Sequence, residues 1–199
     1  MALNFGQHFA ILNLDWMSIL IDPVKDTVEG QALITNCSRW NDAIHQKTPR
    51  PLTIFTTLSF SPGQPELKSD TPFSKMIAPF GTFEQGTPEA QIYPEFTIDE
   101  KDIVLQKTRW SATSGNSLEQ ILRAQAIDTV VISGLSLSGV VMSTIYRLFD
   151  WDLNIYVIAG NVLELPVDQN ADFSKVMLDT LLPKMGLQVI SLNEALQAI

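Results

Sequence analysis

The sequence predicts an α/β fold, a three-layer domain whose six-stranded, mostly parallel sheet is flanked by helices. Strand-like and helix-like segments alternate along the chain, which is typical of parallel sheets. Residues 129–132 and 155–158 are continuously apolar, as expected of strands that helices cover on both faces. Residues 1–199 fit one domain of ordinary size and no linker divides them, so we expect a single domain.

The individual elements follow from the apolar patterns and from the residues that flank them. Strands are expected at residues 8–15, 51–58, 102–107, 128–134, 153–159 and 186–191. Helices are expected at residues 26–47, 116–125, 138–150, 171–183 and 192–198. Asn116 or Ser117 can cap the second helix, and Asp172 or Ser174 can begin the fourth.

One long stretch, residues 59–100, has no assigned strand or helix and is rich in proline. A loop of this length inside a compact domain is usually functional or a disordered insertion. It carries Phe60, Phe73, Phe80 and Phe83, which we expect to be exposed. Because large apolar patches on a protein surface usually mark contacts, the stretch is expected to act as a contact surface or as a lid.

Charged side chains follow two of the expected strands at the point where each strand ends. Asp15 comes directly after the apolar run 9–14, and Lys107 comes directly after residues 102–106. The carboxyl ends of parallel strands meet at one edge of the sheet, which is where ligand sites form. Burial there disfavours the charged carboxylate, a nearby lysine counters this, and such a pair can move a proton. The alternatives are an aspartate that caps a turn and a solvated lysine at a strand end.

The segment 130–141 is a buried strand that runs through a glycine- and serine-rich loop into a helix. The free N–H groups at a helix N-terminus can hold an anion or an oxyanion. Ser136 and Ser138 lie in this loop, but a serine nucleophile needs a neighbouring base, and the only histidines, His8 and His45, lie on other elements. We therefore expect these serines to cap the helix, and two histidines without metal-ligand spacing argue against a transition-metal site.

The composition restricts the classes of partner. The net charge of −9, from 22 acidic and 13 basic residues, disfavours nucleic acid and anionic membranes, which both require a basic patch. Apolar runs are shorter than the roughly 20 residues of a membrane span, and no signal-peptide pattern begins the chain, so a cytoplasmic protein is expected. The single cysteine, Cys37, excludes an intrachain disulfide, and its helical surroundings predict a small buried hydrophobe.

Four segments in this order resemble the isochorismatase-like superfamily of cysteine hydrolases. They are the strand end at Asp15, the run 86–96 (GTPEAQIYPEF), Lys107 with the following Ser-Ala pair, and the loop 134–144. The resemblance extends from about residue 8 to residue 195 and implies a Rossmann-like, six-stranded parallel sheet. It also implies an Asp-Lys-Cys triad, no cofactor, and assembly into homo-oligomers, which are common in the family.

Two of the three triad residues have a match in this sequence, and the third does not. The resemblance assigns the aspartate to Asp15 and the lysine to Lys107, but the cysteine position is Val140. A non-proline cis peptide, frequent in the nucleophile loop of the family, maps to Leu135–Ser136. The metal-binding histidines of nicotinamidases have no counterpart. Valine cannot attack a carbonyl, so the resemblance predicts that amide hydrolysis through a thioester is lost.

The predicted pocket is apolar and suits a small, rather apolar molecule. Its expected substrate-binding residues are Trp16, Arg109, Trp110, Leu135, Ser136, Leu137, Gly139 and Val140. Among these, Arg109 can bind an anionic group of the substrate or form a surface salt bridge.

Two functions remain open. True isochorismatases also lack the cysteine, because in their reaction the aspartate protonates the enol carbon of a vinyl ether and water adds to the resulting cation. The resemblance therefore allows vinyl-ether hydrolysis, isomerisation or dehydration by Asp15 with Lys107. The alternative is a catalytically inactive binding or assembly protein that keeps the fold.

Overall fold

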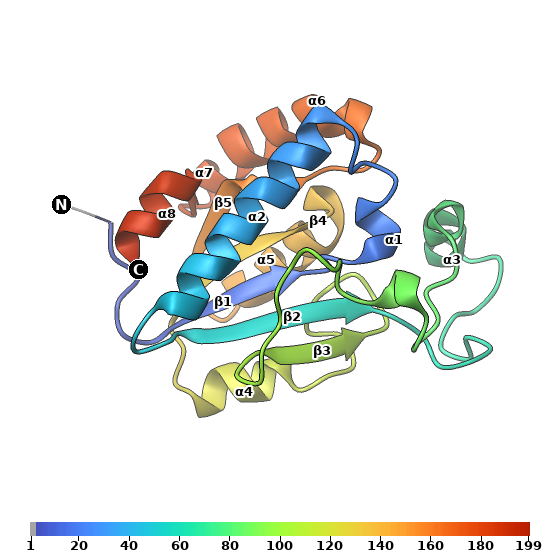
Figure 1. Ribbon diagram of the computed structural model, residues 1–199, viewed down its shortest axis with the longest axis horizontal. Coiled ribbons are helices and arrows are strands. Elements are labelled where there is room, and N and C mark those ends of the chain that lie inside the picture. Colours follow the sequence, from blue (N-terminus) through green and yellow to red (C-terminus); the bar gives the residue numbers. More distant parts are fainter. Residues whose placement is uncertain (1–2) are drawn as a thin grey trace.

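The computed structural model describes residues 3–199 and has one six-stranded sheet between two layers of helices (Figure 1). The strands are β1 (Phe9–Leu14), β2 (Leu52–Leu58), β3 (Ile103–Lys107), β4 (Thr129–Leu135), β5 (Asn154–Leu163) and β6 (Gln188–Ile190). They are arranged in the order β3-β2-β1-β4-β5-β6, and all five neighbouring pairs are parallel. The predicted α/β fold with a parallel sheet is therefore confirmed.

The helices follow the expected order, and several short helices that were not expected occur between them. The α-helices are α1 (Ser18–Ile21), α2 (Val28–Gln46), α3 (Pro72–Ile77), α4 (Leu118–Ala124), α5 (Met142–Phe149), α6 (Asn170–Val176), α7 (Leu182–Lys184) and α8 (Leu192–Ala198). No helix of residues 3–199 combines the length and apolar character that a membrane crossing requires.

Side chains alternate between the two faces of the sheet and so build two hydrophobic cores. Along β1, Ile11 belongs to the core under α1, α2 and α8, whereas Leu12 and Leu14 belong to the core under α4, α5 and α7. In Figure 1, α2 crosses in front of the sheet and α5 lies behind it. This two-sided burial explains the continuously apolar central strands.

Several element boundaries differ from the sequence-based expectation. Strand β5 continues four residues beyond the expected end at residue 159, after an irregularity in its pairing with β4. The helix expected at 138–150 begins with a π-helical turn, Leu137–Val141, and the one expected at 171–183 is interrupted by a second, Met177–Leu181. These π turns are single-turn departures from α-helical hydrogen bonding, and an average apolar period over a whole helix does not reveal them.

The stretch 59–100 is more ordered and more buried than expected. It contains α3 and two short 3-10 turns, and in Figure 1 α3 lies beyond the carboxyl ends of β2 and β3. The expectation that its four phenylalanines are exposed is wrong for Phe60 and Phe83, which are 0% and 1% exposed, and Phe73 and Phe80 are half-buried. The segment therefore contributes apolar side chains to the core rather than an outward patch.

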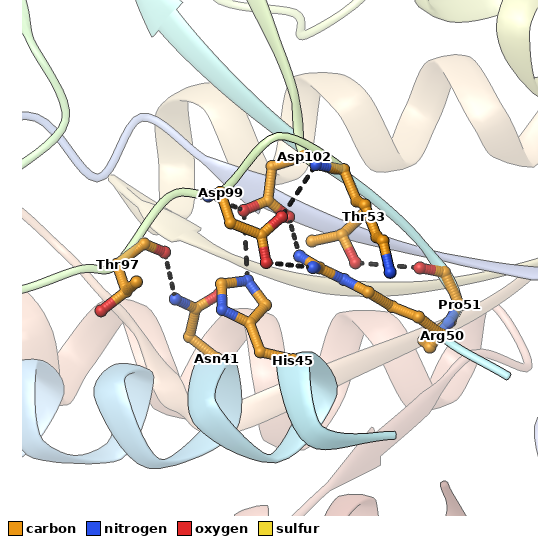
Figure 2. A network of polar contacts seen from close by, with 9 residues as sticks. Asn41, His45, Arg50, Pro51, Thr53, Thr97, Asp99 and Asp102 are labelled. Atoms are coloured by element: carbon orange, nitrogen blue, oxygen red, sulfur yellow. Dashed lines mark hydrogen bonds and ion pairs between the residues drawn. The ribbon is translucent and has the colours of Figure 1, made fainter. Parts of the chain in front are cut away.

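At the opposite edge of the sheet, the amino ends of β2 and β3 are joined by a network of ion pairs (Figure 2). The guanidinium of Arg50 donates to carboxylate oxygens of both Asp99 and Asp102, and His45 Nε2 of α2 lies 3.1 Å from Asp102 Oδ2. His45 and the two aspartates are close enough together to suggest a cation site. Because Arg50 already donates to both carboxylates, we interpret the cluster as structural.

Candidate active site

Asp15 lies directly after β1, in a backbone conformation that turns the chain out of the sheet. Its φ is 57°, in the left-handed region, which aspartate tolerates better than most residues. The turn is held by two backbone hydrogen bonds, from Asp15 N–H to the carbonyl of Thr56 at 3.1 Å and from Met17 N–H to the carbonyl of Asp15 at 2.8 Å. Such conformations concentrate at functional sites, where the surrounding structure enforces them.

The carboxylate of Asp15 is paired with Lys107, as the strand-end argument predicts. Lys107 Nζ lies 2.7 Å from Asp15 Oδ2, and it also donates to the carbonyl oxygen of Arg109 at 2.9 Å. The hydroxyl of Thr56 donates to Asp15 Oδ1 at 2.8 Å. Asp15 is 3% exposed and Lys107 1%, so this is a buried ion pair whose oxygens are both engaged. Its orientation is fixed from β2, the neighbour of β1, and from β3, the next strand on the same side.

Burial shifts the protonation equilibria of both partners toward their uncharged forms. It raises the pKa of Asp15 from its ordinary value of 3.8, even though the Lys107 charge and the hydrogen bonds from Lys107 and Thr56 lower it. It likewise lowers the pKa of Lys107 from 10.5, against the raising effect of Asp15. Asp15 and Lys107 are thus two titratable groups, 2.7 Å apart, whose shifted pKa values mark a candidate site of proton transfer.

Asp15 forms part of the wall of a cavity of about 350 Å³ at the carboxyl edge of the sheet. Most of the wall is apolar, with Leu58 from the end of β2, Leu135 from the end of β4 and Leu165 from beyond β5. The stretch 59–100 covers the cavity with side chains that include Phe83. A volume and lining of this kind suit a small, largely apolar ligand.

The loop between β4 and α5 forms one side of the cavity. The Leu135–Ser136 peptide bond is cis, as the resemblance implies. The N–H of Ser138 donates to Glu164 Oε2 at 2.6 Å, so this loop is fastened to the end of β5. A Cβ atom on Gly139 would lie 2.7 Å from the Ser136 hydroxyl, which explains why glycine is required at that position.

The predicted binding residues divide into two groups. Trp110, Leu135, Ser136 and Val140 line the cavity. The structure places Trp16, Arg109, Leu137 and Gly139 outside its wall.

Each of the outlying side chains has a partner elsewhere. Trp16 is fully buried and packs against Phe55 and Phe96, with ring centroids 5.8 and 4.6 Å apart. Leu137 is fully buried in the core below α5. Arg109 is exposed, and its guanidinium donates to the backbone carbonyl oxygen of Glu66 at 3.0 Å, which is a surface contact but not a salt bridge.

Two polar residues of the site were missed by sequence reasoning. Thr56 lies within the expected strand 51–58, and threonine is so common in strands that its residue type gave no signal. The available signal was its position beside Asp15 in a parallel sheet. Glu164 follows β5, and the sequence analysis ended that strand at residue 159. An error of four residues at a strand end was enough to place this carboxylate outside the predicted site.

Cys37 lies away from the cavity, on α2. It is fully buried, its Sγ lies 3.9 Å from the carbonyl oxygen of Asn161, and burial raises the pKa of its thiol well above 9.0. A thiol in this environment stays protonated and is a poor nucleophile. The placement agrees with the prediction of a small buried hydrophobe.

Comparison with known proteins relates the whole of this architecture to one family. The isochorismatase domain matches residues 9–194. An uncharacterized isochorismatase family protein of Bacillus subtilis (strain 168), YwoC, is 30% identical over 144 residues, which cover 69% of this chain and 74% of that protein.

Solved structures show the same fold at lower sequence identity. An isochorismatase family protein from Burkholderia thailandensis is 19% identical with a TM-score of 0.78, covering 100% of this chain and 98% of its own. A cysteine hydrolase from Pseudomonas syringae pv. phaseolicola 1448A is 14% identical with a TM-score of 0.80, covering 96% and 92%. An N-carbamoylsarcosine amidase from Thermoplasma acidophilum is 19% identical with a TM-score of 0.73, covering 94% and 98%. These likenesses establish the fold alone.

Proposed function

The chain belongs to the isochorismatase family, and we propose that it performs acid–base chemistry on a small molecule without a cysteine nucleophile. The observation that carries this proposal is the buried pair of Asp15 and Lys107 in contact with an apolar cavity. Asp15 is the proposed proton donor and acceptor, and Lys107 sets its protonation state. The cavity holds the substrate and excludes water.

The residue at the position of the family cysteine supports a cysteine-free reaction. Val140, which the resemblance aligns with the family cysteine, lines the cavity and is 2% exposed. Its side chain has no group that attacks a carbonyl. Cys37 does not line the cavity and cannot replace it. Chemistry at this site therefore depends on proton transfer, which a single positioned acid or base accelerates by about 10²–10⁴-fold.

The proposed reaction class is vinyl-ether hydrolysis, isomerisation or dehydration. In each of these reactions a proton is delivered to or removed from carbon or oxygen, and no covalent bond to the protein is required. The raised pKa of Asp15 keeps its carboxyl group protonated at a higher pH than an exposed aspartate. It can therefore donate a proton at a pH at which an ordinary aspartate is ionised, and Lys107, 2.7 Å away, stabilises the carboxylate that results.

The alternative is a binding or assembly protein without catalysis. The apolar wall, with valine at the proposed nucleophile position, favours this reading because it provides affinity without a reactive group. Under this alternative the Asp15–Lys107 pair is a structural element that closes the ends of β1 and β3.

The two functions are separated by ligand screening followed by turnover. Thermal-shift measurements with small apolar carbonyl and enol-ether compounds identify ligands, and each hit is then assayed for conversion. The acid–base proposal expects Asp15→Asn to bind a converted hit but to turn it over far more slowly than the parent protein. Asp22→Asn is the matched control, because that carboxylate is half exposed and pairs with Lys25 outside the cavity. Binding without conversion by the parent protein supports the alternative.

A further inference from the structure

The formal charges of the side chains that line the cavity do not sum to zero. Two carboxylates, Asp15 and Glu164, line it, and among residues 3–199 no lysine, arginine or histidine does. Asp15 is neutralised by Lys107, which lies behind it. Glu164 is 2% exposed, and within the described chain no cationic side chain forms an ion pair with it. The wall therefore carries one formal negative charge in excess.

Backbone groups hold Glu164 in place but leave acceptor capacity. Its Oε2 accepts from Ser138 N–H at 2.6 Å, and its Oε1 accepts from Leu165 N–H at 3.1 Å. Its own N–H donates to Asn170 Oδ1 at 2.9 Å, which fixes the backbone. A carboxylate offers about four lone-pair sites, so about two remain after these bonds. A buried carboxylate without a cationic partner is costly, and a cationic ligand removes that cost.

Aromatic side chains form a large part of the same wall. Phe80 and Phe83 come from the stretch 59–100, Trp110 from the loop after β3, and Phe173 from α6. The faces of aromatic rings attract cations by their quadrupole, most effectively where water is excluded. Carbon-rich groups attached to the cation also gain from contact with the aliphatic part of the wall. Anions, in contrast, meet an unneutralised carboxylate.

We propose that the cavity binds a small organic cation, an alkyl-substituted ammonium compound, with Glu164 as its counter-charge and the aromatic side chains around its alkyl groups. The inference rests on the proposed function for the place of the site, because both concern the same cavity. It adds the chemical class of the ligand and a specificity-determining residue. Glu164 therefore does more than hold the loop at Ser138, because a neutral side chain could accept the same hydrogen bond.

Three probes of nearly equal shape test this charge preference by isothermal titration calorimetry. Choline carries a quaternary ammonium, 3,3-dimethylbutan-1-ol replaces its nitrogen by carbon, and 3,3-dimethylbutanoate carries a negative charge instead. The parent protein is expected to bind choline roughly 10- to 100-fold more tightly than the alcohol, the range of a charge-assisted contact, and to bind the anion most weakly. Choline affinity no greater than that of the alcohol, absence of choline binding, or preference for the anion overturns the proposal.

Glu164→Gln identifies the residue responsible. The amide oxygen of glutamine can still accept from Ser138 N–H, so the fold is expected to persist, and thermal unfolding checks this. The variant should lose most of the preference for choline while its affinity for the alcohol stays near that of the parent. Asp172→Asn is the matched control, since this exposed carboxylate lies beside Phe173 in the chain but outside the cavity wall. An unchanged choline preference in folded Glu164→Gln contradicts the role of Glu164.

The test also separates this inference from the proposed function. Binding is measured without turnover, so the two proposals have separate readouts. If Asp15→Asn retains full turnover, the acid–base proposal fails while the cation site stands. If choline shows no preference but Asp15→Asn loses turnover, the cation site fails while the acid–base proposal stands.

Discussion

Two clusters of charged side chains lie at opposite edges of the same sheet, and they differ in what surrounds them. At the amino edge, Arg50 bridges Asp99 and Asp102, and backbone N–H groups and His45 occupy the remaining carboxylate oxygens. Among residues 3–199, these aspartates line none of the five main cavities. At the carboxyl edge, the Asp15 carboxylate is part of a cavity wall.

The two clusters also differ in the direction in which they shift a carboxyl pKa. The backbone N–H of Lys101, together with Arg50, lowers the pKa of Asp99, so this carboxyl is held ionised. Burial raises the pKa of Asp15 in spite of Lys107. Buried charge by itself therefore does not identify a reactive site. A carboxyl group that lines a cavity and has a raised pKa is a better indicator of a reactive site.

The largest expected effect is on turnover, in Asp15→Asn. Asparagine keeps the size of the side chain and can still accept from the Thr56 hydroxyl, but it provides no acidic proton. We expect turnover of a converted ligand to fall about 10²–10⁴-fold, with ligand affinity nearly unchanged. Single-turnover kinetics measures this effect, with Asp99→Asn at the opposite edge as a control that should react at the parental rate. A variant as fast as the parent would show that Asp15 is structural.

The next largest effect is on stability, in Arg50→Met. This change leaves Asp102, whose side chain is fully buried, without its main cationic partner. Breaking a buried pair in this way costs about 3 kcal/mol of the free energy of unfolding, which denaturant titration measures. The matched control is Arg147→Met, which breaks the more exposed pair with Glu119 and should cost much less. Equal losses in the two variants would contradict the structural role of the amino-edge network.

A smaller effect is expected in how stability depends on pH. In the window between 3.8 and the raised pKa of Asp15, the native protein binds this proton more tightly than the unfolded chain. The contribution of Asp15 to the free energy of unfolding is therefore present below 3.8 and is lost as the pH rises through the folded-state pKa. The stability difference between parent and Asp15→Asn should decrease with rising pH in that window.

For Asp99, the contribution to stability should change with pH in the opposite direction, which sharpens the comparison between the two edges of the sheet. Its pKa is lowered from 3.8, so its contribution is present above 3.8 and is lost as the pH falls through the folded-state pKa. Urea titrations of Asp15→Asn and Asp99→Asn across the acidic range measure both slopes. Slopes of the same sign would show that the two carboxyl groups do not experience different environments.

The sequence predicted the fold and half of the candidate site for clear physical reasons. Apolar runs that alternate with helical patterns can satisfy their burial only in a parallel sheet with helices on both faces. In such a sheet, the carboxyl ends of all the strands lie at one edge, which is why the pairing of Asp15 with Lys107 across β2 could be anticipated.

The remainder depended on details that periodicity does not encode. The extension of β5 to residue 163 brings Glu164 to the cavity, and the run of apolar residues ahead of it contains Gly160 and Asn161, which disguise the strand. The loop at 135–140 leads into a π turn, which an apolar pattern does not reveal. Leu137 and Val140 both belong to the core below α5, yet only Val140 also lines the cavity.

The smallest expected effect belongs to the thiol, in Cys37→Ser. Cys37 is fully buried on α2 beside the carbonyl oxygen of Asn161, and burial keeps its thiol protonated. Because the side chain does not line the cavity, turnover and ligand affinity should remain at the parental level. Any change should be confined to stability, since the serine hydroxyl is more polar than the thiol, and Cys37→Ala separates polarity from loss of volume. Loss of turnover in a folded Cys37→Ser variant, measured with the same ligand used for Asp15→Asn, would mean that a thiol takes part in the reaction, and the cysteine-free proposal would have to be abandoned.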